Sequence, residues 1–324
     1  MFQRVIASAA ISVIAALGLF QSEIACAADD EQQKAILVTG ASTGIGRSIA
    51  ETLAENGYFV YAGARKQADL DELNKIPNIQ SLRLDVTRQD EIDAAAEIVR
   101  AGGKGLYGLV NNAGVLVLGP ITEIDEDELA WIFDVNVMGV FRVTKAFAPL
   151  IIESRGRISN ISSIAGIGSE MLWAPYNMSK HALESYTDDL AAEMALFGVQ
   201  VSAINPGNYN SKIGSKEAAS IAKKPYSQPG SVYAEYMADQ IAYMSDRSMF
   251  KDPDEVTAAV MHALFAEKPK PNYMVVPDQE EAEWTISKII EEMAELNADQ
   301  KYSYSDEELV EMVKAATAAQ RARQ

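Results

Sequence analysis

The feature that most constrains the fold of this 324-residue chain is a regular alternation between short apolar runs and longer amphipathic stretches. The runs are rich in β-branched residues and apolar on both faces, as expected for strands buried inside a parallel sheet. The stretches between them place apolar residues at helical spacing, as Ile49, Leu53 and Ala54 do before Gly57. This pattern predicts an α/β fold, a doubly wound seven-stranded parallel sheet with helices on both faces. The predicted strands are residues 35–39, 58–63, 79–85, 106–111, 157–162, 199–205 and 273–276.

We interpret residues 29–324 as a single domain, because no linker or change of composition interrupts the alternation before residue 208. Residues 208–252 then break the pattern with prolines, a lysine pair and several tyrosines and methionines. An insert of this kind usually covers a site. From residue 278 to the end the sequence is helical and acidic, with twelve Asp and Glu against five Lys and Arg. We interpret this C-terminal extension as a solvated face.

The first 28 residues have the features of a targeting segment. Arg4 precedes an apolar run at residues 5–20, and Ala25-Cys26-Ala27 offers a small-residue cleavage site before two aspartates. The segment predicts a signal peptide or an uncleaved N-terminal anchor, and hence an exported, periplasmic or membrane-anchored protein. If the segment is not used, the protein stays in the cytoplasm.

Charge and composition argue against several classes of function. The chain carries 28 Lys and Arg against 46 Asp and Glu, a formal net charge of −18, which repels nucleic-acid backbones and anionic membrane surfaces. The single cysteine, Cys26, cannot build an internal disulfide or a thiolate zinc site. His181 and His262 are too few for a histidine-rich metal centre. We therefore expect no nucleic-acid partner and no metal, and we interpret both histidines as structural.

The strongest local signal is a glycine-rich segment placed directly after the first predicted strand and directly before the first predicted helix. Glycine lets the backbone turn tightly and approach a pyrophosphate, whose charge is then bound by the amides at a helix N-terminus. The pattern therefore predicts a dinucleotide-binding loop rather than a simple turn. Its sequence is Thr39-Gly40-Ala41-Ser42-Thr43-Gly44-Ile45-Gly46.

This Gly-x-x-x-Gly-x-Gly spacing, together with four further motifs in order along the chain, resembles the short-chain dehydrogenase/reductase family. The resemblance covers residues 35–276, and the joint pattern is far more specific than any one motif. It implies a Rossmann fold, a nicotinamide cofactor and a homo-oligomer. The four motifs are Asn111-Asn112-Ala113-Gly114, Asn136 within Asp134-Val135-Asn136-Val137, Ser163 thirteen residues before Tyr176-Asn177-Met178-Ser179-Lys180, and Asn205-Pro206-Gly207.

The resemblance assigns Asn136, Ser163, Tyr176 and Lys180 as the catalytic residues, and the chemistry of these side chains agrees. Tyr176 and Lys180 are four residues apart and share one face of a helix. A neighbouring ammonium favours the phenolate, so we expect Lys180 to lower the pKa of Tyr176, which then acts as general acid and base. Ser163 is expected to hydrogen-bond the substrate oxygen as charge develops on it. The resemblance implies that Asn136 holds a water in the proton relay.

The end of the second predicted strand indicates which nicotinamide cofactor binds. A carboxylate there accepts from the ribose 2′-hydroxyl of NAD, whereas an arginine binds the 2′-phosphate of NADP. Here Ala64 stands at the acidic position and Arg65 follows, which predicts NADP(H) over NAD(H). Asp85 and Val86, by resemblance, contact the adenine. The predicted cofactor-binding residues are Gly40, Ser42, Thr43, Gly44, Ile45, Gly46, Arg65, Asp85, Val86, Asn112, Ala113, Gly114, Tyr176, Lys180, Pro206 and Gly207.

Together these observations predict an NADP(H)-dependent oxidoreductase that moves hydride between the cofactor and a small-molecule ketone, aldehyde or secondary alcohol. Apolar and aromatic residues before Tyr176 and in the 208–252 insert indicate either a lipophilic substrate, similar to a steroid or a retinoid, or simply a packed lid. Two alternatives stay open: a non-catalytic NADP-binding redox sensor, and a dehydratase or epimerase that retains its cofactor. The apolar and aromatic residues are Met171, Leu172, Trp173, Tyr226, Tyr233, Tyr236, Met237, Tyr243 and Met244.

Overall fold

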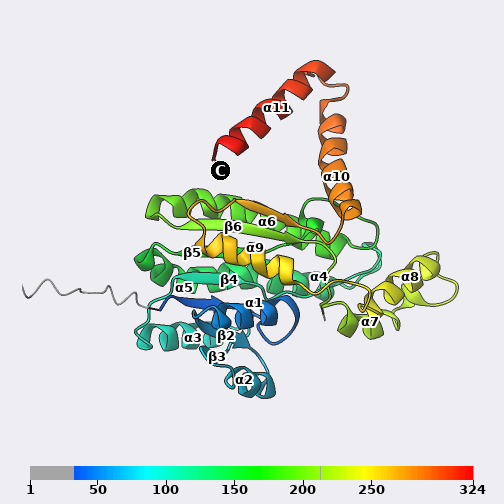
Figure 1. Cartoon of the computed structure of the whole chain (residues 1–324). Coiled ribbons are helices and arrows are strands. Elements are labelled where there is room, and N and C mark those ends of the chain that lie inside the picture. Colours follow the sequence, from blue (N-terminus) through cyan, green and yellow to red (C-terminus); the bar gives the residue numbers. More distant parts are fainter. Residues whose placement is uncertain (1–32, 212, 324) are drawn as a thin grey trace, which may run out of the picture. The chain divides into compact units, whose positions relative to one another are not determined.

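The computed structural model describes residues 33–211 and 213–323. The predicted signal peptide or anchor, residues 1–28, lies outside the described residues. From Lys34 onward the chain forms one compact unit, built around a single β-sheet with helices on both of its faces (Figure 1).

The sheet contains seven parallel strands in the order β3-β2-β1-β4-β5-β6-β7, which confirms the predicted doubly wound fold. In the middle of the sheet, Val38 of β1 lies opposite Ala62 of β2 and Val110 of β4. The strand order reverses between β1 and β4, so the loops leaving these two strands diverge to opposite faces and open a crevice at the carboxyl ends. The strands are β1 (Ala35–Val38), β2 (Phe59–Ala64), β3 (Ile79–Arg83), β4 (Gly108–Asn111), β5 (Arg157–Ile161), β6 (Gln200–Pro206) and β7 (Asn272–Val275).

Alternate residues of the central strand pack into two separate cores, one on each face of the sheet. Ile36 and Val38 share a core with apolar residues of α1 and α9, which lie side by side (Figure 1). Leu37 shares the other core with residues of α3 and α5. This two-sided burial explains why the strands are apolar throughout. The helices are α1 (Gly44–Glu55), α2 (Gln67–Leu73), α3 (Gln89–Ala101), α4 (Glu126–Phe133), α5 (Val140–Ser154), α6 (Ala174–Met194), α7 (Ser215–Ile221), α8 (Ala234–Ser245), α9 (Asp254–Phe265), α10 (Gln279–Asn297) and α11 (Asp306–Arg323).

Four short helical turns complete the chain between these elements. They are the π-helix η1 (Asp134–Gly139) and the 3₁₀ helices η2 (Ile164–Gly166), η3 (Ala195–Phe197) and η4 (Pro225–Ser227). Through η1, helices α4 and α5 join into one helix over residues 126–154. Among the described residues, this helix is long and apolar enough to cross a membrane. Half of its apolar stretch is buried, and Val143 and Phe147 pack fully buried in the core, so we interpret it as a core helix.

The 208–252 insert folds into α7, η4 and α8, and these pack around a third apolar core. Met237 and Met244 of α8 lie in this core with Leu116, Leu118 and Leu172, which belong to loops at the carboxyl end of the sheet. The 278–324 extension contains α10 and α11. The insert is thus anchored on the loops that lead into the crevice.

Candidate active site

A cleft of about 880 Å³ opens at the carboxyl ends of the strands, where the strand order reverses. This is where open α/β sheets bind their ligands. Every residue predicted from the sequence to bind the cofactor lines this cleft, and so do Ser163, Tyr176 and Lys180. Asn136 lies behind the wall, 1% exposed. The structure therefore brings together residues from six different strand ends and from α6.

The glycine loop between β1 and α1 owes its shape to backbone angles that glycine adopts freely. Gly40 and Gly44 have φ angles of +66° and +59°, in the left-handed region. Gly46 is required for a different reason: a Cβ built there would lie 2.2 Å from Asn112 Nδ2 and 2.5 Å from the Gly40 carbonyl oxygen. Two glycines of the motif are thus needed for conformation and the third for close packing.

Asn112 and Ala113, which follow β4, hold the glycine loop in place across the crevice. Asn112 Nδ2 donates to the carbonyl oxygens of Thr39, at 2.9 Å, and Gly40, at 3.2 Å. The backbone N–H groups of Asn112 and Ala113 donate to Thr39 Oγ1 at 2.9 and 3.0 Å. The Asn-Ala-Gly motif therefore shapes the nucleotide loop in addition to lining the cleft.

The start of α1 fits the pyrophosphate of a dinucleotide. The helix begins at Gly44, and the side chain of its N-cap residue, Thr43, makes no hydrogen bond to the helix. The amides of the first turn therefore face the cleft without a side-chain cap, and no acidic side chain stands in that turn. These amides and the positive end of the helix dipole suit an anionic ligand.

Arg65 and Asp85 lie together at the ends of β2 and β3, at the opposite end of the cleft from Tyr176. The Arg65 side chain is 63% exposed, and its Nη1 lies 3.9 Å from Asp85 Oδ2. Arg83, which is in register with Ala64, donates from Nη1 to the Arg65 carbonyl oxygen at 2.5 Å. Two guanidinium groups therefore stand at this end. Arg83 does not line the cleft, and its Nε lies 3.9 Å from Glu91 Oε1.

Ser163, Tyr176 and Lys180 converge where the cleft meets β5. Ser163 caps η2: its Oγ accepts from the backbone N–H two residues later at 3.1 Å and donates to the Pro206 carbonyl oxygen at 3.4 Å. Tyr176 and Lys180 lie one turn apart on α6. Lys180 Nζ donates to the carbonyl oxygen of Ile161, the last residue of β5, at 2.9 Å and lies 5.6 Å from the centroid of the Tyr176 ring. The strand end thus fixes the ammonium near the phenol.

Burial sets the protonation states of these two groups. It raises the pKa of Tyr176 to about 12, and a hydrogen bond with Ser163 offsets only part of the rise. Burial lowers the pKa of Lys180 to about 8, although the negative charge of Glu184 acts to raise this pKa. The prediction that the pKa of Tyr176 lies below its ordinary value is wrong, because desolvation of the phenolate raises it more than the hydrogen bond with Ser163 lowers it. At neutral pH Tyr176 holds its proton and Lys180 is mostly charged.

Asn136 lies behind the cleft wall and is bonded to Val115, which lines the cleft. Its Oδ1 accepts from the N–H of Val115 at 2.9 Å, and its Nδ2 donates to the carbonyl oxygen of Val115 and to Ser179 Oγ, both at 3.0 Å. A Cβ built on Gly114 would lie 3.5 Å from Asn136 Oδ1 and 4.0 Å from Lys180 Nζ, so these two atoms border the same space. Both amide hydrogens of Asn136 are bonded to the protein, and one lone pair of Oδ1 is left to accept from a water. The relay role stays a prediction.

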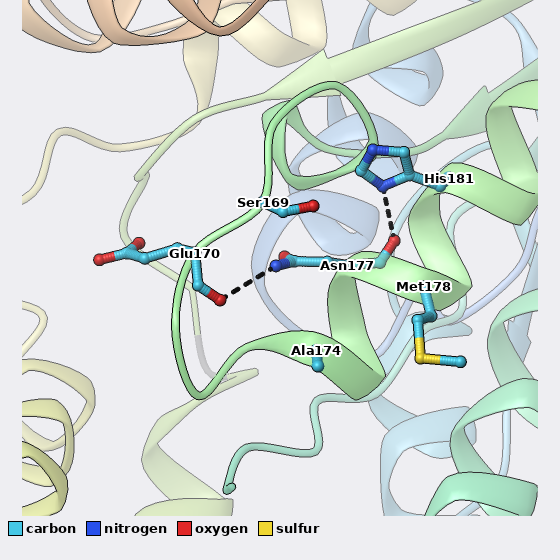
Figure 2. A pocket seen from close by; sticks show the side chains of 6 residues that line it. All are labelled: Ser169, Glu170, Ala174, Asn177, Met178 and His181. Atoms are coloured by element: carbon cyan, nitrogen blue, oxygen red, sulfur yellow. Dashed lines mark hydrogen bonds between the residues drawn. The ribbon is translucent and has the colours of Figure 1, made fainter. Parts of the chain in front are cut away.

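A smaller pocket of about 250 Å³ adjoins the cleft beside the start of α6. Figure 2 shows His181 in this pocket, its Nδ1 2.9 Å from the Asn177 carbonyl oxygen, and Asn177 donating from Nδ2 to the Glu170 carbonyl oxygen at 3.4 Å. Glu170 and Asn177 line both pockets, whereas His181 lines the smaller one. The bond of His181 to Asn177 therefore lies within α6, the helix that also carries Tyr176 and Lys180, and His181 does not line the cleft.

Helix α8 of the insert is bonded to the segment that leads into α6. Trp173 Nε1 donates to Gln240 Oε1 of α8 at 3.1 Å, and the Trp173 ring packs edge-on against Tyr176 with centroids 6.1 Å apart. Most of the insert residues chosen from the sequence take one of the two expected roles, lining the cleft or packing in the core of the insert. Tyr243 and Met244 line the cleft, Tyr226 and Met237 are buried in the core of the insert, Tyr233 packs against that core, and Tyr236 is 54% exposed.

The first turn of α10 forms part of the cleft wall, which the interpretation of residues 278–324 as a solvated face missed. Asp278, Glu280, Glu281 and Trp284 line the cleft. The available signal was the helix-start pattern Asp-x-x-Glu, and Asp278 Oδ1 does accept from the N–H of Glu281 at 3.0 Å. That pattern marks where a helix begins but not what the helix contacts.

Comparisons with known proteins agree with this architecture. The family model described as short chain dehydrogenase matches residues 34–221. The mitochondrial D-beta-hydroxybutyrate dehydrogenase of Bos taurus is 34% identical over 271 residues, which cover 77% of this chain and 78% of the relative. Retinol dehydrogenase 7 of Mus musculus is 34% identical over 75% of this chain and 80% of its own length. The solved structure of a short-chain dehydrogenase from Streptomyces avermitilis superposes with a TM-score of 0.70 at 30% identity, covering 82% of this chain and 96% of that chain.

The family match spans more than half of the sequence, and its residues carry both the glycine loop and the Ser163, Tyr176 and Lys180 cluster. The relatives extend the similarity over three quarters of the chain. The protein belongs to the short-chain dehydrogenase/reductase family of oxidoreductases.

Proposed function

We propose that this oxidoreductase transfers hydride between NADP(H) and a ketone, aldehyde or secondary alcohol. The observation that carries the proposal is that Ser163 and Tyr176 line the same cleft as the glycine loop, with the buried Lys180 ammonium beside the phenol ring. A substrate oxygen between Ser163 and Tyr176 meets two hydroxyl donors, which stabilise the charge that develops on it.

In the direction of reduction, Tyr176 gives its proton to the substrate oxygen as that oxygen gains negative charge. A bound nicotinamide supplies the hydride for reduction and accepts it in oxidation. Lys180 stabilises the resulting phenolate, because its ammonium is fixed by the bond to the Ile161 carbonyl oxygen. The hydrogen bond from Ser163 Oγ to the Pro206 carbonyl oxygen is long, at 3.4 Å, so this hydroxyl turns toward a substrate at little cost.

The preference for NADP(H) is supported by the charges at the ends of β2 and β3. Arg65 lines the cleft and is largely exposed, and Arg83, outside the cleft lining, donates to its carbonyl oxygen. Ala64 offers no acceptor for a ribose 2′-hydroxyl. Asp85 Oδ1 already accepts from the N–H of Thr87 at 3.0 Å and from its hydroxyl at 2.7 Å. A 2′-phosphate beside Arg65 gains charge-assisted hydrogen bonds that NAD cannot make.

We further propose a lipophilic substrate. Apolar side chains line the part of the cleft between Tyr176 and the insert, among them Trp173, Ile213, Met244 and Phe250. Such a wall suits an apolar molecule with few polar groups. Retinol dehydrogenase 7, a relative over most of the chain, is named for an alcohol of this kind.

The test follows NADPH and NADH oxidation with a panel of ketones in wild type, Tyr176→Phe and Arg65→Gln. Tyr236→Phe, a change on the exposed side of α8, is the matched tyrosine control. We expect Tyr176→Phe to lose about 100-fold or more in kcat while NADPH still binds, because a general acid is removed. Arg65→Gln is expected to weaken NADPH binding about tenfold and to leave NADH binding unchanged.

The alternatives give different outcomes in the same assay. NADPH binding without ketone-dependent oxidation refutes the reductase and favours a redox sensor. Conversion of a substrate with no net change in the cofactor favours a dehydratase or epimerase. Binding of NADH as tight as that of NADPH in the wild type contradicts the cofactor preference and leaves the reductase proposal standing.

A further inference from the structure

Helix α10 is joined to the loop after β6 by one carboxylate, that of Glu281. Its Oε2 accepts from the backbone N–H of Asn208 at 2.9 Å, and its Oε1 accepts from Asn208 Nδ2 at 2.8 Å. The two residues are 73 positions apart in the sequence. Both carboxylate oxygens are thus bonded to a single residue, an arrangement that fixes the position and the direction of the loop.

The neighbouring glycine shows how closely the helix approaches. A Cβ built on Gly207 would lie 1.9 Å from Glu281 Oε2, closer than any side chain tolerates. Gly207 has no left-handed φ, and the atom nearest to the built Cβ is the end of the flexible Glu281 side chain, so the distance records how closely that carboxylate lies against the loop. The Glu281 carboxylate therefore lies directly against the backbone of the Pro206-Gly207 segment.

Helix α10 is itself held on the cleft by further contacts. Thr285 is fully buried, so this side of α10 is covered, although the bond from its Oγ1 to the Glu281 carbonyl oxygen lies within the helix. A Cβ built on Gly168 would lie 2.8 Å from the Trp284 ring and 3.1 Å from Cγ of Lys288, so α10 also packs on the loop that follows Ser163. The helix thus bridges the loops after β5 and β6, both of which border the catalytic serine.

The loop after β6 belongs to the reacting end of the cleft. Ser163 Oγ donates to the carbonyl oxygen of Pro206, at the end of β6. Arg65 follows β2, which lies four strands away from β6 in the sheet order. Hydride transfer requires the nicotinamide to lie next to the substrate carbon held at Ser163 and Tyr176. On the proposed function, the nicotinamide half of the cofactor therefore lies against the loop at Pro206 and Asn208, and the adenine half lies near Arg65.

We propose that Glu281 is a positioning residue for the nicotinamide half of the cofactor, acting through its bidentate contact with Asn208. The acidic C-terminal extension then contributes a positioning residue to the cofactor site. The inference rests on the proposed function. It predicts different effects on the two halves of the cofactor: loss of Glu281 weakens the binding of ligands that contain the nicotinamide and leaves the binding of the adenine half unchanged.

The experiment measures binding of NADPH and of 2′-phospho-ADP-ribose, which lacks the nicotinamide, by titration calorimetry with the full chain. NADH and ADP-ribose are measured in the same way. The first variant is Glu281→Gln, whose amide has only one acceptor oxygen and so cannot accept both hydrogen bonds from Asn208 as the carboxylate does. The second is Asn208→Ala, which removes only the side-chain donor. Glu283→Gln, an exposed carboxylate two residues further along α10, is the matched control. Melting temperatures of all variants report on general loosening.

We expect Glu281→Gln to weaken NADPH binding on the order of tenfold, as for the loss of a charge-assisted hydrogen bond, with 2′-phospho-ADP-ribose unchanged. Asn208→Ala gives a smaller effect of the same kind, and the double variant is no worse than Glu281→Gln alone, because both changes break one contact. Equal weakening of both ligands, or no weakening of NADPH, overturns the inference. If Glu281→Gln does not fold, Asn208→Ala decides by the same comparison. Failure of the wild type to bind any of the four ligands instead refutes the proposed function.

Discussion

Replacement of Lys180 by methionine is expected to make the protein more stable at neutral pH while it abolishes activity. Lys180 is 5% exposed, and burial lowers its pKa from 10.5 to about 8. A tenfold change in the proton-binding constant corresponds to about 1.4 kcal/mol, so the buried ammonium destabilises the folded state by about 3 kcal/mol at pH 7. Methionine fills a similar volume without charge. It loses the hydrogen bond to the Ile161 carbonyl oxygen, worth about 1 to 2 kcal/mol, so the net gain is about 1 to 2 kcal/mol.

The sign of this difference depends on pH. Because the pKa in the folded state lies below that of the unfolded chain, the wild type carries its full penalty below about pH 8. As pH rises from 8 to 10.5, the folded protein loses the proton before the unfolded chain does. The unfolded state then binds more protons, so the stability of the wild type rises with pH. Above pH 10.5 the penalty is gone, and the missing hydrogen bond leaves Lys180→Met the less stable protein.

Urea denaturation of wild type and Lys180→Met at pH 7 and pH 10 measures both effects. The expected result is a higher midpoint for Lys180→Met at pH 7 and a smaller or reversed difference at pH 10. A variant that is less stable at pH 7 by the same amount as at pH 10 would refute the reasoning, because it would mean that the ammonium carries no desolvation penalty. Lys288→Met on α10, where the lysine is more exposed, serves as the control and is expected to show no such reversal.

Two further predictions concern the nucleotide loop and the pH profile. Gly46→Ala is expected to destabilise the protein by about 1 to 3 kcal/mol and to weaken nucleotide binding, because its Cβ would meet Asn112 Nδ2 and the Gly40 carbonyl oxygen. Gly57→Ala, with φ of +83° and no atom within 4 Å of the new Cβ, should cost about 1 kcal/mol and leave binding unchanged when both are measured by calorimetry and urea denaturation. The kcat for ketone reduction should stay level between pH 6 and 7 and fall as pH rises through about 8, because Lys180 loses its charge there. A kcat that rises from pH 7 to 9 would contradict the role given to the Lys180 ammonium.

The fold and the glycine loop could be predicted because their signals are local. Apolar β-branched runs such as β1 are buried on both faces wherever they lie in the sheet, and the Gly40 and Gly44 turns need left-handed angles whatever surrounds them. Strand ends were less well defined: β4 begins at Gly108 rather than at residue 106, and β6 continues through Pro206. The ends of a strand depend on where a neighbouring strand supplies hydrogen bonds. The residue pattern of one strand carries no information about its neighbours.

The features that could not be predicted depend on contacts between distant segments. The pKa of Tyr176 is governed by the walls around the phenol, and the i, i+4 spacing to Lys180 says nothing about burial. Glu281 lies in a charge-rich helix whose average composition indicates solvent, yet its carboxylate is bonded to Asn208. Asn136 was chosen from its motif, but its contacts with Val115 and Ser179 arise from the π-helical turn η1.

Burial of the cleft wall has opposite consequences for its two titratable groups, and together these prepare the site for reduction. The phenol of Tyr176, with a pKa of about 12, holds a proton at any physiological pH and is ready to protonate a substrate oxygen. Once the proton leaves, the phenolate is an anion in a poorly solvated site, and the nearby ammonium of Lys180 is the group that stabilises it. Lys180 therefore has little effect on the resting tyrosine and a large one on the state that follows proton transfer. An interaction that strengthens as charge develops is the kind that lowers a barrier.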